Sequence, residues 1–320
     1  MITFEHVTKR YGDAVAVDDI SLVIPSRETV MLVGPSGCGK TTTMKMINRL
    51  IEPTSGVIAI DGVDTRGRDV VELRRSIGYV IQQVGLFPHL TVAENVATVM
   101  RLEGWERARV RARVGELLEL VGMPESEFGD RLPGELSGGQ RQRVGVARAL
   151  GVDPLMLLMD EPFGAIDPVT RERLQDELIA LRRVVGKTIV FVTHDIDEAI
   201  KLGDRVALYT PDGRIAQYAT PAELLGRPAS PYVESFLGRG RLVRRLGLIR
   251  LGEVDLEPAG GARPEVTVEI GATLRDALDG VLRAAGGRVG VTDGERLAGV
   301  LDAEGIRRAA STPARGEGGG

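Results

Sequence analysis

The 320-residue chain has few cysteines and aromatic residues, and it lacks any long apolar run. It contains one cysteine, Cys38, one tryptophan and 4% aromatic residues. A single cysteine forms neither an intrachain disulfide nor a cysteine metal cluster, which agrees with a reducing compartment. No segment approaches roughly 18 consecutive apolar residues, and residues 1–5 do not begin a basic segment followed by an apolar run. We therefore expect a cytoplasmic protein.

An excess of positive charge is also missing. The formal net charge is -4, so the chain does not resemble a domain built to neutralise a nucleic-acid backbone, and we expect no nucleic-acid partner. Hydrophobic residues make up 43% of the chain and charged residues 27%, which is ordinary for a folded protein with a sizeable core. The length predicts one large domain and one small one.

Apolar runs rich in Val, Ile and Leu alternate with helical patterns, which predicts an α/β fold with a largely parallel sheet covered by helices. Each predicted strand is short and ends at a polar residue or a glycine, where chemistry is expected. The predicted strands are residues 29–34, 76–81, 155–160, 188–193 and 205–209. From about residue 91 to 151 the pattern is helical throughout, which predicts a helical insertion.

The composition changes after Leu237, so we predict a first domain over residues 1–237. Residues 238–264 combine a basic stretch with Pro and Gly and are predicted to be a linker, either solvated or in contact with anionic lipid. A small α+β module is predicted over 265–310, followed by a flexible tail over 311–320.

A glycine-rich loop at residues 34–41 matches the phosphate-loop pattern, directly between a predicted strand and a predicted helix. Its glycines let backbone N–H groups point at phosphate oxygens, and the helix start adds its positive dipole end. Lys40 is expected to reach the β- and γ-phosphates of a bound nucleotide, and the Thr41 hydroxyl to bind Mg²⁺. The loop alone leaves kinases, GTPases and helicases open. A plain glycine-rich turn is the alternative. The candidate nucleotide-binding residues are Gly34, Pro35, Ser36, Gly37, Cys38, Gly39, Lys40, Thr41 and Thr42.

Two neighbouring carboxylates, Asp160 and Glu161, follow another predicted apolar strand. We predict that Asp160 is a partner of Mg²⁺ and that Glu161 is the catalytic base that orients and polarises the attacking water. The alternative is an acidic cap at the strand end, without a role in chemistry.

The pentapeptide 136–140, Leu-Ser-Gly-Gly-Gln, resembles the signature of the ABC ATPase family. It precedes a predicted helix, so Ser137, Gly138, Gly139 and Gln140 form a second candidate phosphate-binding helix start. In that family the signature of one subunit covers the nucleotide held by the phosphate loop of another. Because the chain has one copy of each motif, the resemblance implies a homodimer.

Further positions resemble functional residues of the same family over residues 2–237. Tyr11 resembles the aromatic residue that stacks on adenine, with core packing as the alternative. Gln82 resembles the glutamine that contacts Mg²⁺ and water, although Gln83 leaves the register open. His194 resembles the histidine that contacts the γ-phosphate, and Asp167 resembles the loop residue that couples the two sites of the dimer.

Residues 77–95 and 160–171 more narrowly resemble the ATPase subunits of importers for quaternary amine osmoprotectants such as glycine betaine, carnitine and choline. This resemblance implies a peripheral subunit at the cytoplasmic face of the inner membrane, with permease subunits and, through them, an extracytoplasmic substrate-binding protein. The alternatives are an importer for another small solute and an ABC ATPase that is not a transporter.

The module at 265–310 resembles a single CBS module, which the osmoprotectant ATPases often carry in tandem as sensors of ionic strength or nucleotides. A lone copy of this size is marginal by itself, so we expect it to pair with a twin in the homodimer. The alternatives are a regulatory sensor and a degenerate dimerisation tail.

Overall fold

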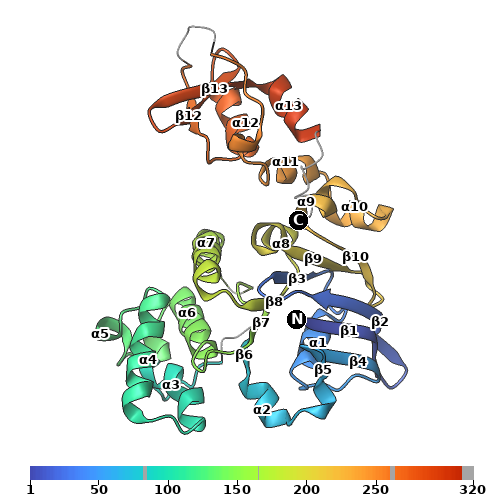
Figure 1. The fold of residues 1–320 in the computed structure, drawn as a ribbon, viewed down its shortest axis with the longest axis vertical. Helices are drawn as coiled ribbons and strands as arrows, with labels where there is room; N and C mark the ends of the chain where they lie inside the picture. The colour runs from blue at the N-terminus through green and yellow to red at the C-terminus, as the bar shows by residue number, and fades with distance from the viewer. Residues whose placement is uncertain (82–84, 165, 260–263, 312–320) are drawn as a thin grey trace. The chain divides into compact units, whose positions relative to one another are not determined.

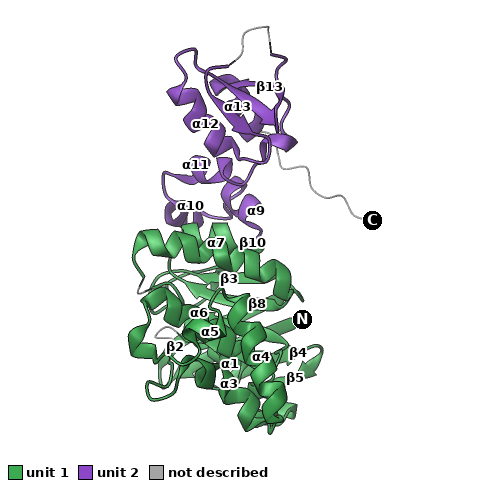
Figure 2. Cartoon of the chain, turned by 90° about the vertical axis from the view of Figure 1, so that its left-hand side faces the viewer, with its two compact units in different colours: residues 1–218 green, residues 219–320 purple. Residues whose placement is uncertain are grey.

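The computed structural model describes residues 1–81, 85–164, 166–259 and 264–311, and the chain divides into two compact units. Unit 1 is Met1–Tyr218 and unit 2 is Ala219–Gly320, coloured green and purple in Figure 2. The sequence alone had placed this boundary after Leu237. The structure groups α9 (Pro221–Gly226) with unit 2 because this helix contacts α11 (Arg241–Leu246).

A six-stranded sheet in the order β10-β9-β3-β8-β7-β6 runs through unit 1 (Figure 1). Its strands are β10 (Ile215–Ala219), β9 (Arg205–Tyr209), β3 (Thr29–Val33), β8 (Thr188–Thr193), β7 (Met156–Asp160) and β6 (Ile77–Val80). The β3–β8, β3–β9, β7–β8 and β6–β7 pairs are all parallel. Every residue of β3, β7 and β8 is buried, as expected for apolar strands covered on both faces. The predicted α/β class is confirmed.

A second sheet of unit 1, in the order β2-β1-β4-β5, was not anticipated. It is antiparallel throughout and consists of β1 (Ile2–Tyr11), β2 (Ala14–Ile24), β4 (Ser55–Ile60) and β5 (Val63–Asp64). A hairpin signal was present at Asp61 and Gly62, which both adopt the left-handed backbone that tight hairpins require, with φ of 50° and 77°. Its buried residues join those of the parallel sheet in one hydrophobic core.

The helices between β6 and β7 fall inside the predicted insertion: α3 (Val92–Leu102), α4 (Arg107–Leu120), α5 (Glu125–Phe128) and α6 (Gly138–Ala149). Thr91 and Glu94 form a capping box that begins α3. The other helices of unit 1 are α1 (Lys40–Ile47), α2 (Val70–Arg75), α7 (Pro168–Val185) and α8 (Ile196–Leu202). In the described part of the chain, no helix is both long enough and apolar enough to span a membrane.

Unit 2 contains a three-stranded sheet in the order β11-β12-β13, with helices packed against it. The strands are β11 (Thr267–Glu269), β12 (Arg288–Asp293) and β13 (Arg296–Asp302), and the helices are α9, α10 (Pro231–Leu237), α11, α12 (Leu274–Arg283) and α13 (Ala303–Ser311). β11 pairs with β12 in parallel, and β12 pairs with β13 antiparallel. The three strands, α12 and all but the last residue of α13 lie within residues 265–310, where the small α+β module was predicted, whereas α9, α10 and α11 precede it.

Much of the segment predicted to be a linker is instead part of unit 2. Within residues 238–264 the chain forms α11, and Leu246 and Leu251 are buried in the same core as α12 and β12. Glu257 forms a β-bridge with Val300 of β13. Arginines dominate the composition of this stretch, so its sequence did not indicate that the apolar residues between them are buried.

Candidate functional site

The parallel pairing of β3, β8 and β7 brings their carboxyl ends to one edge of the sheet. Val33 at the end of β3 lies opposite Thr193 at the end of β8, and Asp160 at the end of β7 lies opposite Val192. Beyond the strand end, the Glu161 backbone N–H donates to the Val192 carbonyl at 3.0 Å. Residues that immediately follow these strands therefore share one edge, which is where ligands bind in open α/β sheets.

The loop after β3 has two positions that only glycine fits. Gly34 and Gly39 have φ of 154° and 94°, and a Cβ on Gly39 would lie 2.2 Å from the Ala16 carbonyl oxygen. A Cβ on Gly34 would lie 2.9 Å from the Tyr209 Cβ. Gly37 has φ of 82° and faces open space. The backbone is therefore packed tightly at both ends of the loop and accessible at its tip, as a phosphate cradle requires.

Lys40, the first residue of α1, lies against this loop with its side chain almost fully buried. Its ammonium donates to the carbonyl oxygens of Gly34 and Pro35, both at 2.8 Å, and lies 3.7 Å from the Cys38 sulfur. Burial raises the pKa of the Cys38 thiol, although the Lys40 charge opposes that rise. The ammonium is thus held at the loop by the carbonyl groups of the loop itself.

A hydrogen bond joins the start of α1 to the end of β7. The Thr41 hydroxyl donates to Asp160 Oδ1 at 2.9 Å, as the sequence-based assignment of both residues to one metal site requires. Burial raises the pKa of the Asp160 carboxyl, while the Thr41 hydrogen bond and the charges of Lys45 and Lys40 oppose the rise. Hydroxyl and carboxylate oxygens side by side suit a hard cation such as Mg²⁺.

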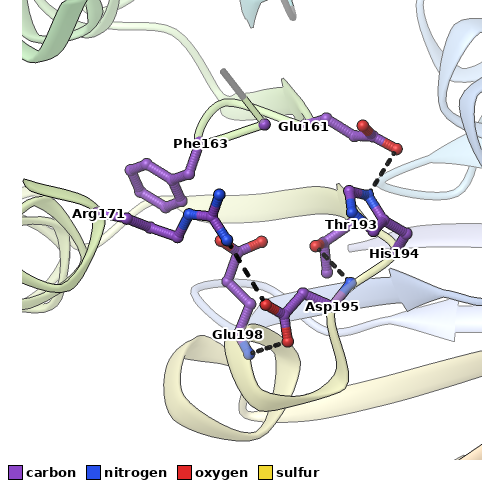
Figure 3. Close-up of a pocket in the computed structure, with 8 residues that line it drawn as sticks. Glu161, Phe163, Arg171, Thr193, His194, Asp195 and Glu198 are labelled. Carbon is purple, nitrogen blue, oxygen red and sulfur yellow. Dashed lines mark hydrogen bonds and ion pairs between the residues drawn. The ribbon is translucent and has the colours of Figure 1, made fainter. Parts of the chain in front are cut away.

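Glu161 and His194 face each other across this edge (Figure 3). The distance from Glu161 Oε1 to His194 Nδ1 is 3.4 Å, and the two side chains are 22% and 57% exposed. Glu161 has φ of 41°, a left-handed conformation that is strained for a residue with a Cβ. Both side chains line a pocket together with Phe163, Arg171 and others. The strand edge thus presents a carboxylate and an imidazole that can act on the same ligand.

The signature residues form the start of α6. Ser137 caps the helix: its hydroxyl accepts from the Gln140 N–H at 3.3 Å, and Gln140 Oε1 accepts from the Ser137 N–H at 2.8 Å. A Cβ on Gly139 would lie 3.2 Å from Leu174 of α7, whereas Gly138 is exposed. In Figure 1 α6 and α1 lie apart, with β6 and β7 between them. Within one chain, the signature is therefore not brought to the phosphate loop.

The remaining predicted residues have different surroundings. Tyr11 is 51% exposed, and the Lys9 ammonium lies 4.9 Å from its ring centroid, so the alternative of core packing is wrong. Asp167 is exposed and caps α7 by accepting from the Thr170 N–H at 3.0 Å, and this contact lowers the pKa of its carboxyl. Gln82, with its neighbour Gln83, lies outside the described residues.

Three charged pocket residues were not assigned to the site from the sequence: Arg171, Asp195 and Glu198. Asp195 follows His194 directly and precedes a helical pattern, which is a signal for a helix cap. Arg171 and Glu198 come from different helices and meet only in the folded chain, so no local pattern indicates their proximity.

Comparisons with known proteins show the family of the chain. The family model described as ABC transporter matches residues 17–164. The osmoprotectant import ATP-binding protein OsmV of Salmonella typhimurium is 50% identical over 285 residues, covering 87% of this chain and 74% of that protein. The glycine betaine uptake system ATP-binding protein YehX of Escherichia coli is 49% identical over 278 residues, covering 87% and 89%. A dimeric ATP-binding cassette solved in a post-hydrolysis state with ADP and Pi is 36% identical, with a TM-score of 0.61, over 69% of this chain and 99% of that one.

The chain belongs to the ABC transporter family, as an ATP-binding subunit with ATPase activity. The predicted family and P-loop ABC ATPase fold are confirmed. Residues 17–164 include the phosphate loop, the signature and the two carboxylates after β7.

Replacing Asp160 with Asn tests the burial of this carboxyl. Because burial raises its folded-state pKa above the ordinary value of 3.8, Asp160 stabilises the fold most at low pH, and this stability is lost as the pH rises through the folded-state pKa. Asn cannot ionise and still accepts from Thr41. Without nucleotide or magnesium, we expect Asp160→Asn to unfold at higher urea concentration than the wild type at pH 7, with a smaller difference at pH 4.5.

The matched control is Asp130→Asn at an exposed carboxylate, which should change the free energy of unfolding by less than about 0.5 kcal/mol. A lower midpoint for Asp160→Asn than for the wild type at pH 7 would contradict the burial argument.

Proposed function

We propose that the chain hydrolyses MgATP as the engine subunit of an importer for quaternary amine osmoprotectants. The observation that carries the reaction is the single sheet edge where the phosphate loop, the Thr41–Asp160 pair and the Glu161–His194 pair come together. The names of the two relatives, osmoprotectant import and glycine betaine uptake, support the class of cargo.

The phosphate loop binds the triphosphate in this proposal. Backbone N–H groups around Gly37 and the start of α1 point at phosphate oxygens, and a charge at such a helix start gains up to about 2 kcal/mol. The phosphates compete with the carbonyl groups of Gly34 and Pro35 for the Lys40 ammonium. Tyr11, exposed at the end of β1, stacks on the adenine ring.

Thr41 and Asp160 hold the metal, with Gln82 as a further partner. Held there, Mg²⁺ would supply positive charge that offsets the negative charge developing on the phosphates. Among the described residues no three His, Cys, Asp or Glu side chains cluster as a metal cage. Phosphate oxygens and water would supply the remaining ligands, as is usual for Mg²⁺.

Glu161 is the general base, and its carboxylate orients the attacking water and accepts its proton. His194 lies within 3.4 Å of that carboxylate and contacts the γ-phosphate, so it fixes the distance between the base and the reacting group. Asp167, at the start of α7, couples this site to the second site of a dimer.

A second copy of the chain completes the site. Ser137, Gly138, Gly139 and Gln140 form a phosphate-binding helix start on α6, away from α1 of the same chain. The dimeric cassette with ADP and Pi supports a partner of the same kind. We therefore propose a homodimer in which each signature covers the nucleotide bound by the other copy.

The cargo never touches this chain in our proposal. Integral membrane permease subunits carry it across the membrane, and an extracytoplasmic substrate-binding protein delivers it to them. The ATPase chain is then peripheral at the cytoplasmic face of the inner membrane, with no nucleic-acid partner. An importer for another small solute, such as a polyamine, is the alternative that an uptake experiment must separate.

Unit 2 is proposed to be regulatory. Its order β11-α12-β12-β13-α13 is the order of elements expected for a single CBS-like module. A lone module of this size pairs with its twin in the homodimer, where it senses ionic strength or a nucleotide.

Glu161→Gln tests the base. The amide keeps the size of the side chain and its hydrogen bonding but cannot accept a proton, so we expect a kcat about 10²- to 10⁴-fold lower with the dissociation constant of MgATP nearly unchanged. Steady-state phosphate release and calorimetric titration measure the two quantities. Glu172→Gln, at an exposed carboxylate of α7, is the matched control and should retain wild-type turnover. Full turnover by Glu161→Gln would remove Glu161 as the base.

Uptake of labelled glycine betaine and choline tests the cargo. In source cells that have no duplicate system, we expect uptake at high osmolarity with the wild-type chain and its loss with Glu161→Gln. Excess unlabelled carnitine should compete, whereas excess spermidine should not. Normal glycine betaine uptake in the Glu161→Gln cells would contradict the osmoprotectant assignment while leaving the ATPase assignment in place.

A further inference from the structure

Arg171, in the first turns of α7, connects the two segments that carry Glu161 and His194. Its guanidinium donates to the Ile166 carbonyl oxygen at 3.0 Å, in the loop that follows Glu161. A second guanidinium nitrogen lies 3.9 Å from Asp195 Oδ2, in the turn that follows His194. One side chain therefore bridges the loop after β7 and the turn after β8.

Asp195 is itself held firmly by the start of α8. Its Oδ1 accepts from the backbone N–H groups of Asp197 at 2.8 Å and Glu198 at 3.4 Å. Its own N–H donates to the Thr193 hydroxyl at 3.0 Å. The Oδ1 atom is thus occupied by the helix cap, and Oδ2 faces Arg171 (Figure 3).

A buried carboxyl, Glu198, lies beneath this bridge. It is 5% exposed and accepts from Gln175 Nε2 of α7 at 3.2 Å. Burial raises its pKa, while hydrogen bonds from Thr193 and Gln175 and the positive charge of Arg171 oppose that rise. Figure 3 shows the Arg171 guanidinium between Phe163 and the Glu198 carboxyl. The positive charge of Arg171 therefore lies near one buried carboxyl of α8, in addition to joining two loops.

The bridge is not arranged for stability alone. Arg171 Nε is buried without a hydrogen-bond partner in the described ranges, and an unpaired buried donor lowers the stability of the fold. The contact to Asp195 is also long for a hydrogen bond. Arg171 thus leaves one buried donor unpaired while it links two loops at the reaction site, which points to a role in positioning rather than in stability alone.

We propose that Arg171 is a positioning residue that sets the distance between His194 and Glu161. The inference rests on the proposed roles of those two residues in hydrolysis. The two chain neighbours of His194 are held in place: Thr193 hydrogen-bonds to Glu198, and Asp195 faces Arg171. The His194 imidazole itself is more than half exposed. The bridge determines where the imidazole lies relative to the Glu161 carboxylate.

Arg182 provides a matched control on the same helix. It also binds one carbonyl group and one carboxylate, Leu202 at 2.6 Å and Asp204 at 3.0 Å, and its side chain is 28% exposed compared with 31% for Arg171. Both substitutions by alanine remove a similar structural contact. Arg182 does not line the pocket that holds Glu161 and His194.

The test measures kcat and KM for ATP in the purified full-length chain. We expect Arg171→Ala to lower kcat about 10- to 100-fold, because a misplacement of roughly 1 Å has effects of this size. KM should change less than about threefold, and Arg182→Ala should stay within about twofold of the wild type in both quantities. In a His194→Ala background, adding Arg171→Ala should lower kcat less than about threefold further, because residues that act as a unit are not additive.

Arg171→Lys keeps the positive charge but loses the planar guanidinium, so its kcat should lie between those of the wild type and Arg171→Ala. If Arg171→Ala does not fold, Arg171→Lys replaces it in the test. The positioning role is overturned if Arg171→Ala, or Arg171→Lys in its place, keeps wild-type kcat. It is also overturned if the losses multiply fully in the double variant or if Arg182→Ala has the same effect. A wild-type chain without ATPase activity would instead overturn the proposed function.

Discussion

The parallel pairing of β8 with both β3 and β7 is the constraint on which the site depends. It places three strand ends at one edge, so the phosphate loop, the carboxylates after β7 and the imidazole after β8 converge there. These strands are apolar on both faces, so they are stable only inside a sheet that is covered on both sides. The burial of these strands therefore also positions the residues of the site.

Several polar groups at this edge are held close to one another, and Lys40, Asp160 and Glu198 among them are buried. Lys40 binds the carbonyls of its own loop, Thr41 binds Asp160, and Arg171 bridges towards Asp195 above the buried Glu198. Burying such groups costs free energy unless they are hydrogen-bonded, so these contacts stabilise the edge. The left-handed backbone at Glu161 is consistent with this arrangement, because strain of this kind concentrates where a site over-determines the conformation.

The sequence predicted the parts of the site that a local pattern encodes. The loop with Gly34 and Gly39, the carboxylates after β7 and His194 after β8 all follow apolar strands of the predicted length. It did not reveal the antiparallel sheet, whose alternating strands are mixed with exposed charges. It also concealed Leu246 and Leu251 among arginines, so that a folded part of unit 2 was taken for a linker. The Arg171–Asp195 contact joins α7 to the turn before α8 and has no local signal at all.

The central claim is that this strand edge holds the triphosphate of ATP and that a second copy completes it. A crystal structure of the full-length Glu161→Gln chain with MgATP tests it most directly. The account predicts the γ-phosphate between Lys40 and His194 of one copy and the Ser137 helix start of another, with the metal on Thr41 and Asp160. Nucleotide bound elsewhere, or covered by the signature of the same chain, would contradict it.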